Sequence, residues 1–229
     1  MFNYTTLNGG VRMSKRKNSY YSPEFRLEAV KMVKEQGLST LEASNRLSMP
    51  KSAPEKLRLF YDQFEGHDHV LIVINADPDA IGSAMAVSRL LWRRVLNVTI
   101  SNVNTINRPD NRAMLRLLDV TTVPFNQINP GKFNKFVIVD SQPDHNEFMA
   151  QLKPDVIIDH HPDSKPQAPF VDIRPNYGAT ATILTEYLRA AKIKPSVKLA
   201  TGLFQAIKID TNAFKGQTAI EDVRAFQFL

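Results

Sequence analysis

Short apolar runs alternate with longer helical patterns along most of the chain, and this alternation limits the possible folds more than any other feature. Strands that alternate with helices are typical of a parallel sheet, because each parallel connection needs a crossover segment. The sequence therefore predicts an α/β fold, a mostly parallel sheet flanked by helices. Strands are expected at residues 70–74, 98–101, 136–140, 156–159 and 170–173, and helices at 81–95, 111–118, 178–191, 197–207 and 218–228.

The composition is typical of a globular protein and excludes several kinds of functional site. Of the 229 residues, 43% are hydrophobic, which is enough for at least one sizeable core. The chain has no cysteine, so disulfides, thiolate metal sites, iron–sulfur clusters and a cysteine nucleophile are excluded. The apolar runs are of strand length, and residues 1–30 lack the apolar stretch of a secretory signal. We therefore expect a cytoplasmic protein with no membrane partner.

The positive charge is concentrated near the N-terminus. Residues 1–60 carry 11 Lys and Arg against 5 Glu, which equals the formal net charge of +6 of the whole chain. A basic segment beside a neutral body indicates that the two parts differ in partner or origin. A solubilising basic tail is the plainer interpretation.

Residues 21–55 show the pattern of two short helices after a polar lead-in, residues 1–20, that is expected to be disordered. Ser22 and Pro23 are typical of a helix start, and Gly37 is typical of its end. The stretches 21–30, 35–39 and 43–47 resemble the N-terminal helix-turn-helix of insertion-sequence transposases. The resemblance implies DNA binding, with Arg46 and Lys51 as candidate contacts.

The transposase pattern changes where its recognition helix is expected. The usual Leu-x-x-Trp at the close of that helix is replaced here by residues 53–57, in which Pro54 would lie in a first helical turn or break it.

Acidic residues directly follow three of the predicted strands. Asp77 and Asp79 follow the first, Asp140 ends the third, and the Asp-His-His run 159–161 ends the fourth. Because the carboxyl ends of parallel strands meet at one edge of a sheet, we expect these side chains to lie close together. Grouped carboxylates repel one another, and a divalent cation neutralises them; mixed Asp and His ligands suit Mn²⁺. The histidines at 67, 69 and 145 are expected in solvent.

The order of these motifs resembles the DHH phosphoesterase superfamily over residues 56–229. The motifs are residues 75–83, 139–141, 159–161 and Gly202 with 209–211, and residues 178–182 match a helix-opening segment of the family. The superfamily includes RecJ-type exonucleases, nano-RNA and cyclic-dinucleotide phosphodiesterases, and family II pyrophosphatases. The resemblance implies a phosphodiesterase that hydrolyses nucleotide or oligonucleotide phosphoesters with two Mn²⁺ ions, or with Mg²⁺.

The resemblance also implies which residues bind the metals. Asp77 would bind the first ion, Asp79 the second, and Asp140 would bridge both. His160 and Asp210 would complete the second site.

Further roles follow from the same resemblance. His161 would contact the substrate phosphate, and Asp159 would orient its neighbours, so that the expected catalytic residues are Asp140, Asp159 and His161. Gly82 and Ser83 would open a helix whose amides meet the phosphate.

Two departures from the family bear on activity. The family has a metal-binding His four residues before its first Asp, and this chain has Val73 there, so the first metal site is expected to be weakened. The family's C-terminal substrate-binding domain is expected to be absent, which would impair activity. Two alternatives remain open at this point: a transposase-derived fusion that binds DNA through its N-terminal segment, and an inactive gene remnant.

Overall fold

The chain divides into two units, Met1–Lys51 and Ser52–Leu229, and each is described by itself. The computed structural model describes residues 30–32, 34–37, 39 and 52–229. In the first unit, residues 30–32 and 34 are helical and Gly37 has φ +67°, a left-handed value that suits the predicted helix end. The lead-in 1–20, most of the helix-turn-helix and its candidate DNA contacts Arg46 and Lys51 lie outside the described residues and stay predictions.

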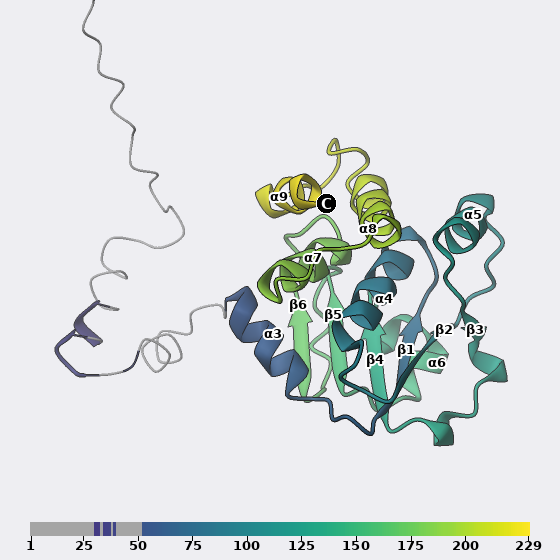
Figure 1. The fold of residues 1–229 in the computed structure, drawn as a ribbon, viewed down its shortest axis with the longest axis horizontal. Coiled ribbons are helices and arrows are strands. Elements are labelled where there is room, and N and C mark those ends of the chain that lie inside the picture. Colours follow the sequence, from purple (N-terminus) through teal and green to yellow (C-terminus); the bar gives the residue numbers. More distant parts are fainter. Residues whose placement is uncertain (1–29, 33, 38, 40–51) are drawn as a thin grey trace, which may run out of the picture. The chain divides into compact units, whose positions relative to one another are not determined.

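Within residues 52–229, the structure is built on a six-stranded sheet with the order β3-β2-β1-β4-β5-β6 (Figure 1). Every neighbouring pair is parallel, which confirms the predicted α/β class. The sequence pattern misses β3, because an edge strand of two residues is too short to show a periodicity. The strands are β1 His69–Ile74, β2 Asn97–Asn102, β3 Val123–Pro124, β4 Lys135–Val139, β5 Val156–Asp159 and β6 Phe170–Ile173.

The helices are α3 Ala53–Tyr61, α4 Pro78–Leu91, α5 Pro109–Leu118, α6 Glu147–Ala150, α7 Thr180–Ala190, α8 Val197–Asp210 and α9 Ile220–Phe228. They agree with the expected ones to within two residues at each end, with these exceptions: α3 and α6 were not expected, α4 spans Pro78–Leu91 rather than 81–95, and α8 continues to Asp210 rather than to residue 207. The four residues of α6 are too few for a helical pattern to be read from sequence. No helix in the described part of the chain is long and apolar enough to cross a membrane.

Helix α3 belongs to the α/β unit, so this unit begins at Ser52, before the expected boundary at residue 56. Pro54 lies in the first turn of α3, where its missing N–H leaves no hydrogen bond unmade. The buried ring of Phe60 packs against Phe170 of β6 and Tyr187 of α7, with ring centroids 6.1 and 6.0 Å away. These contacts fix α3 to the edge of the sheet.

The two faces of the sheet are buried against different partners. Along β1, Val70, Ile72 and Ile74 belong to the main core, which also contains buried side chains of α3, α4, α7 and α8. Leu71 and Val73 point to the other face, into a smaller cluster that includes side chains of α6 and of the loops after β3. Strands buried on both faces read as continuous apolar runs, which is why these strands are visible in the sequence.

Helix α4 starts at Pro78 rather than at the predicted residue 81. Asp77 caps it, because its Oδ1 accepts a hydrogen bond of 2.9 Å from the amide of Ala80. Gly82 and Ser83 therefore lie in the second turn, where helical amides bond to carbonyls of the preceding turn. The prediction that their amides face a phosphate at an open helix end is wrong.

Gly82 has a packing role instead. A Cβ atom there would lie 3.1 Å from the carbonyl oxygen of Gly202 in α8 and 3.2 Å from Cβ of Ala206. Glycine thus allows α4 and α8 to approach closely, and this contact positions the two helix ends that carry Asp79 and Asp210.

Candidate metal centre

Four side chains from four separate elements converge at the carboxyl edge of the sheet. They are Asp79 in the first turn of α4, Asp140 after β4, His160 after β5 and Asp210 at the end of α8. One ligand-type atom from each lies within 4.8 Å of the others. Nε2 of His160 is 3.3 Å from Asp210 Oδ2, 3.6 Å from Asp140 Oδ1 and 3.9 Å from Asp79 Oδ2. We call this group the four-residue centre.

The N-terminus of α7 holds the carboxylate of Asp79. The amide of Thr180 donates to Oδ2 at 2.6 Å, and the amide of Ala181 donates to Oδ1 at 2.8 Å. Ser83 adds a weaker hydrogen bond of 3.3 Å from its hydroxyl. A helix N-terminus favours a negative charge, so α7 both orients and stabilises this ligand.

Asp140 is held in an unusual backbone conformation. Its φ of +58° places it in the left-handed region, which Asp adopts more readily than most residues. Its amide donates to the carbonyl of Ile158 in β5 at 2.9 Å, and the hydroxyl of Thr180 donates to its Oδ1 at 2.9 Å. Non-glycine residues in this conformation concentrate at functional sites, where the surrounding structure fixes them.

The buried carboxylates disfavour one another's negative charge. Burial, followed by the charge of Asp210, raises the pKa of Asp79 to about 7. Burial, followed by the charge of Asp79, raises the pKa of Asp140 well above its usual range. Burial lowers the pKa of His160, but Asp210 and Asp79 outweigh this effect and raise it to about 9. Such a site is stabilised by a positive charge among the carboxylates.

The Nε2 atom of His160 points towards the carboxylates of this group. Its Nδ1 donates to the carbonyl of Tyr177 at 3.2 Å, which directs Nε2 towards the carboxylates. Nε2 is buried and has no hydrogen-bond partner within the described ranges. An imidazole fixed through one nitrogen, with the other facing three carboxylates, is the arrangement of a metal-binding histidine. The residues present therefore fit a divalent cation.

Asp159 orients the two histidines that follow it. It is fully buried and accepts hydrogen bonds from the amide of His160 at 2.9 Å and from Nδ1 of His161 at 2.8 Å. Gln142 donates a third, from Nε2 at 2.6 Å. Burial alone would raise the pKa of Asp159, but these hydrogen bonds lower it below its usual range. The hydrogen bond to Asp159 in turn raises the pKa of His161.

His145 lies closer to the site than the sequence suggested. It is exposed, as expected, but its ring centroid is 5.6 Å from that of His161. Its Nδ1 accepts a hydrogen bond of 3.3 Å from the amide of Gln142. Ligand-type atoms of His145, Asp159 and His161 lie within 4.8 Å of one another, so this solvent-exposed histidine also borders the site, which the sequence pattern did not indicate.

Asp77 lies beside the four-residue centre but is not one of its members. Its carboxylate caps α4, and burial raises its pKa, with a further contribution from Asp210. Val73, the position of the family's histidine, is packed in the smaller apolar cluster, and Asn75 is exposed. The first predicted metal site therefore offers fewer ligands than the second.

A comparison with protein families matches the part of the chain that carries three members of the four-residue centre, and Asp210 lies just beyond it. A model described as the DHH family, N-terminal domain, matches residues 69–207. An uncharacterized protein of Methanocaldococcus jannaschii is 37% identical over 160 residues, which make up 70% of this chain and 34% of that protein. The chain thus spans about a third of the length of this curated relative.

A solved structure shares the fold. It is an exopolyphosphatase-related protein from Bacteroides fragilis, with a TM-score of 0.58 at 17% sequence identity. The likeness covers 76% of this chain and 55% of the solved chain.

Proposed function

The chain belongs to the DHH family, and from this premise we propose that it is a metal-dependent phosphoesterase. The site would act on nucleotide or oligonucleotide phosphoesters. Its metal would be held by the four-residue centre. Mn²⁺ suits the mixed carboxylate and imidazole ligands, and Mg²⁺ is the alternative.

One observation carries this proposal: the buried Nε2 of His160 faces three carboxylates and has no hydrogen-bond partner within the described ranges. Its ion pairs, the shortest at 3.3 Å to Asp210, leave three negative carboxylates around a single imidazole, which is fewer positive charges than the group needs. A cation bound at Nε2 and the carboxylate oxygens satisfies all four groups at once.

The two metal sites proposed from the family pattern are expected to differ in their affinity for the metal ion. The second site would use all members of the four-residue centre. The first would use Asp77 and the bridging Asp140, and it lacks a nitrogen ligand because Val73 is buried among apolar side chains. We therefore expect one tightly bound ion and one weakly bound ion per chain.

The residues around the metals would bind and orient the phosphoester. A divalent cation supplies a Lewis acid and a bound water of lowered pKa when present. His161 is 43% exposed at its side chain and is fixed through Nδ1 by Asp159, so its other nitrogen is available to a phosphate oxygen. Asp159 acts as a positioning residue that sets the orientation of the His161 ring and holds the backbone of His160.

Hydrolysis of bis(p-nitrophenyl) phosphate by the full chain tests the proposal. We expect hydrolysis that requires Mn²⁺ or Mg²⁺ and stops when the metal is removed by chelation. Asp140→Asn is expected to lower the rate at least about a hundredfold, because its carboxylate serves both proposed ions. Asp119→Asn is the matched control, since Asp119 is an exposed carboxylate at the end of α5.

The result that would overturn the proposal is a folded wild-type chain with no metal-dependent hydrolysis of phosphodiesters. A rate that Asp140→Asn leaves unchanged would equally contradict it, because the activity would then arise elsewhere.

A further inference from the structure

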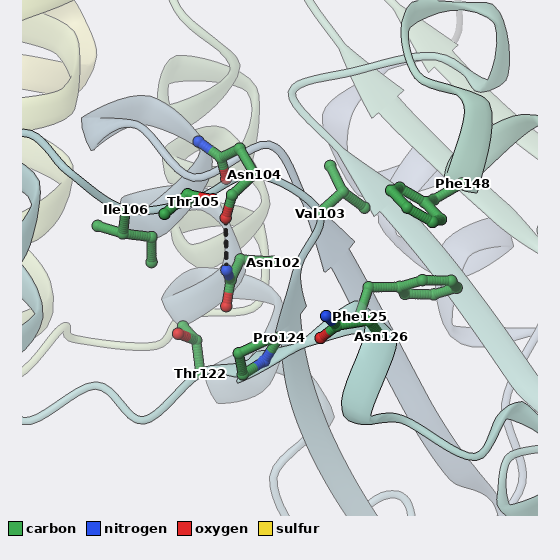
Figure 2. A pocket seen from close by; sticks show the side chains of 10 residues that line it. All are labelled: Asn102, Val103, Asn104, Thr105, Ile106, Thr122, Pro124, Phe125, Asn126 and Phe148. Carbon is green, nitrogen blue, oxygen red and sulfur yellow. Dashed lines mark hydrogen bonds between the residues drawn. The ribbon is translucent and has the colours of Figure 1, made fainter.

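A cavity opens at the carboxyl edge of the sheet, beyond the ends of β2 and β3. Its volume is about 310 Å³, within the usual range for small-molecule sites. Figure 2 shows the side chains that line it, which come from the segments after β2, from the β3 region and from α6. None of the four members of the four-residue centre lines this cavity.

The lining is aromatic and amide-rich, and it is uncharged. Phe125 and Phe148 contribute two rings whose centroids are 5.7 Å apart. Asn102, Asn104 and Asn126 contribute amide groups, and Figure 2 shows Phe148 and the Asn102 amide on opposite sides of the cavity. No Lys, Arg, Asp or Glu is among the ten lining residues. A ligand with several negative charges, such as a polyphosphate chain, would find no countercharge here.

Asn102 lines the cavity, and its amide carries a buried hydrogen-bond acceptor that is held in place. Its side chain is at the end of β2 and is only 6% exposed. Its Nδ2 donates to the carbonyl of Asn104 at 2.7 Å, which directs Oδ1 the opposite way, as the dashed line in Figure 2 shows. Oδ1 is buried and has no hydrogen-bond partner within the described ranges. A buried acceptor without a partner is costly, so a donor supplied by a ligand would be favoured.

The cavity is joined directly to the loop that carries the first acidic motif. Oδ1 of Asn104 accepts from the amide of Ala76 at 2.7 Å, and its Nδ2 donates to the carbonyl of Ala76 at 3.0 Å. Ala76 immediately precedes Asp77, which caps the helix of Asp79. One side of the cavity is therefore fixed to the segment that positions the metal ligands.

We propose that this cavity is a nucleobase subsite for the phosphoester bound at the four-residue centre. The inference rests on the proposed function and names the part of the substrate that lies beyond the phosphate. A base has a flat face that stacks on an aromatic ring, and its N–H groups can donate to Oδ1 of Asn102. An uncharged lining favours a neutral base over a polyanion. The inference thus extends the proposed nucleotide substrate from its phosphate to its base.

Equilibrium binding to the full chain in Mn²⁺ tests the subsite. Adenosine 5′-monophosphate and ribose 5-phosphate share the sugar and the phosphate and differ in the base alone. We expect adenosine 5′-monophosphate to bind roughly tenfold more tightly, which corresponds to one base–aromatic stack. Phe148→Ala is expected to remove most of that difference, whereas Phe204→Ala, which changes an exposed ring on α8, is expected to leave it.

A second variant tests the acceptor. Asn102→Leu removes Oδ1 at similar size, and we expect it to reduce binding of adenosine 5′-monophosphate while binding of ribose 5-phosphate is unchanged. If this buried variant does not fold, Phe148→Ala decides the question alone, because Phe148 is partly exposed on α6.

The outcomes separate this inference from the proposed function. Equal affinities for the two ligands, or no binding of either, would overturn the subsite. Base-dependent binding in a chain that shows no metal-dependent hydrolysis would support the subsite and overturn only the phosphoesterase activity.

Discussion

Asp172 is a fully buried carboxylate of β6 that lies outside the four-residue centre. It accepts hydrogen bonds from Arg174 at 2.7 and 3.0 Å and from the hydroxyl of Tyr187 at 2.6 Å, and it pairs with Lys56 of α3. Burial alone would raise the pKa of Asp172, but Arg174 and Lys56 outweigh it and hold the pKa below the usual value. The carboxylate therefore ties α3 and α7 to the edge of the sheet.

Asp172→Asn is expected to destabilise the protein by about 3 kcal/mol near neutral pH, because it removes the negative member of a buried charged group. A depressed folded-state pKa contributes stability above the unfolded pKa of about 4 and loses it as the pH falls through the folded pKa. The difference between variant and wild type should therefore shrink below a pH of about 4. Urea unfolding across this pH range measures it, and a difference independent of pH would contradict the assignment.

Thr180 belongs to the site, although the sequence indicated only that it lies in a helix-opening segment. Its hydroxyl donates to Asp140, and its amide donates to Asp79, so it touches two proposed metal ligands. Thr180→Val keeps the shape and the amide but removes the hydroxyl.

We expect Thr180→Val to weaken Mn²⁺ binding about tenfold, since groups that orient metal ligands commonly contribute this much. Metal titration of both proteins measures the change. Thr121→Val, at an exposed threonine, serves as the control and should bind Mn²⁺ like the wild type. Unchanged affinity in Thr180→Val would mean that the hydroxyl does not position Asp140.

At the scale of elements, α9 fixes the start of α7. Asp222 of α9 accepts hydrogen bonds from the amide of Gly178 at 2.9 Å and from the hydroxyl of Thr182 at 2.5 Å. The same carboxylate accepts from the amide of Ala219 at 2.6 Å and so closes the first turn of α9. The N-terminus of α7 holds Asp79, so a shift of α9 would also move this member of the four-residue centre.

Gly178→Ala is expected to destabilise the protein by about 1–3 kcal/mol through overpacking. The new Cβ would lie 2.6 Å from the carbonyl oxygen of Gln217, 2.6 Å from Cγ2 of Thr211 and 2.8 Å from Oδ2 of Asp222. The melting temperature should fall by several degrees, as expected for a domain of this size. Gly66→Ala is the control, because no described residue apart from its chain neighbours has an atom within 4 Å of a Cβ at that position. A variant as stable as wild type would show that α9 can shift freely.

At the scale of the whole molecule, folding brings several carboxylates together, and their burial favours the protonated form in the metal-free protein. The pKa of Asp79 is raised to about 7 and that of Asp140 well above its usual range. A raised folded-state pKa contributes stability below the unfolded pKa and loses it as the pH rises through the folded pKa. These two groups therefore make the metal-free fold less stable as the solution becomes more alkaline.

Mn²⁺ is expected to raise the melting temperature more at a pH of about 8 than at about 6, because ligands must lose their protons before they bind a metal. An ion that binds only the folded chain stabilises it by about 2.7 kcal/mol at a hundredfold excess over its dissociation constant. Thermal unfolding with Mn²⁺ and with a chelator at both pH values measures the effect. A shift that is equal at both values, or that persists in Asp140→Asn, would contradict a metal at this centre.

Much of the fold could be predicted because its signals are local. Strands such as residues 70–74 and 156–159 are buried on both faces, so each appears as an apolar run, and the acidic motifs directly follow them. The start of α4 was missed although Asp77 and Pro78 show the N-cap and first-position proline that also mark residues 22 and 23, whereas the packing role of Gly82 depends on its contact with Gly202. The places of His145 and Thr180 beside the site were not predicted. Their partners, His161 for the first and Asp79 and Asp140 for the second, lie far from them in the sequence.

The sequence by itself determined the class of fold and which residue types are gathered at the sheet edge, since apolar runs and the residues that end them are fixed along the chain. Only the tertiary structure decided the membership of the four-residue centre and the place of Asp77 beside it. It also decided that α7 holds Asp79 and that Asn102 lines a cavity. These depend on distances between residues far apart in the chain, and such distances arise only when the helices pack on the sheet.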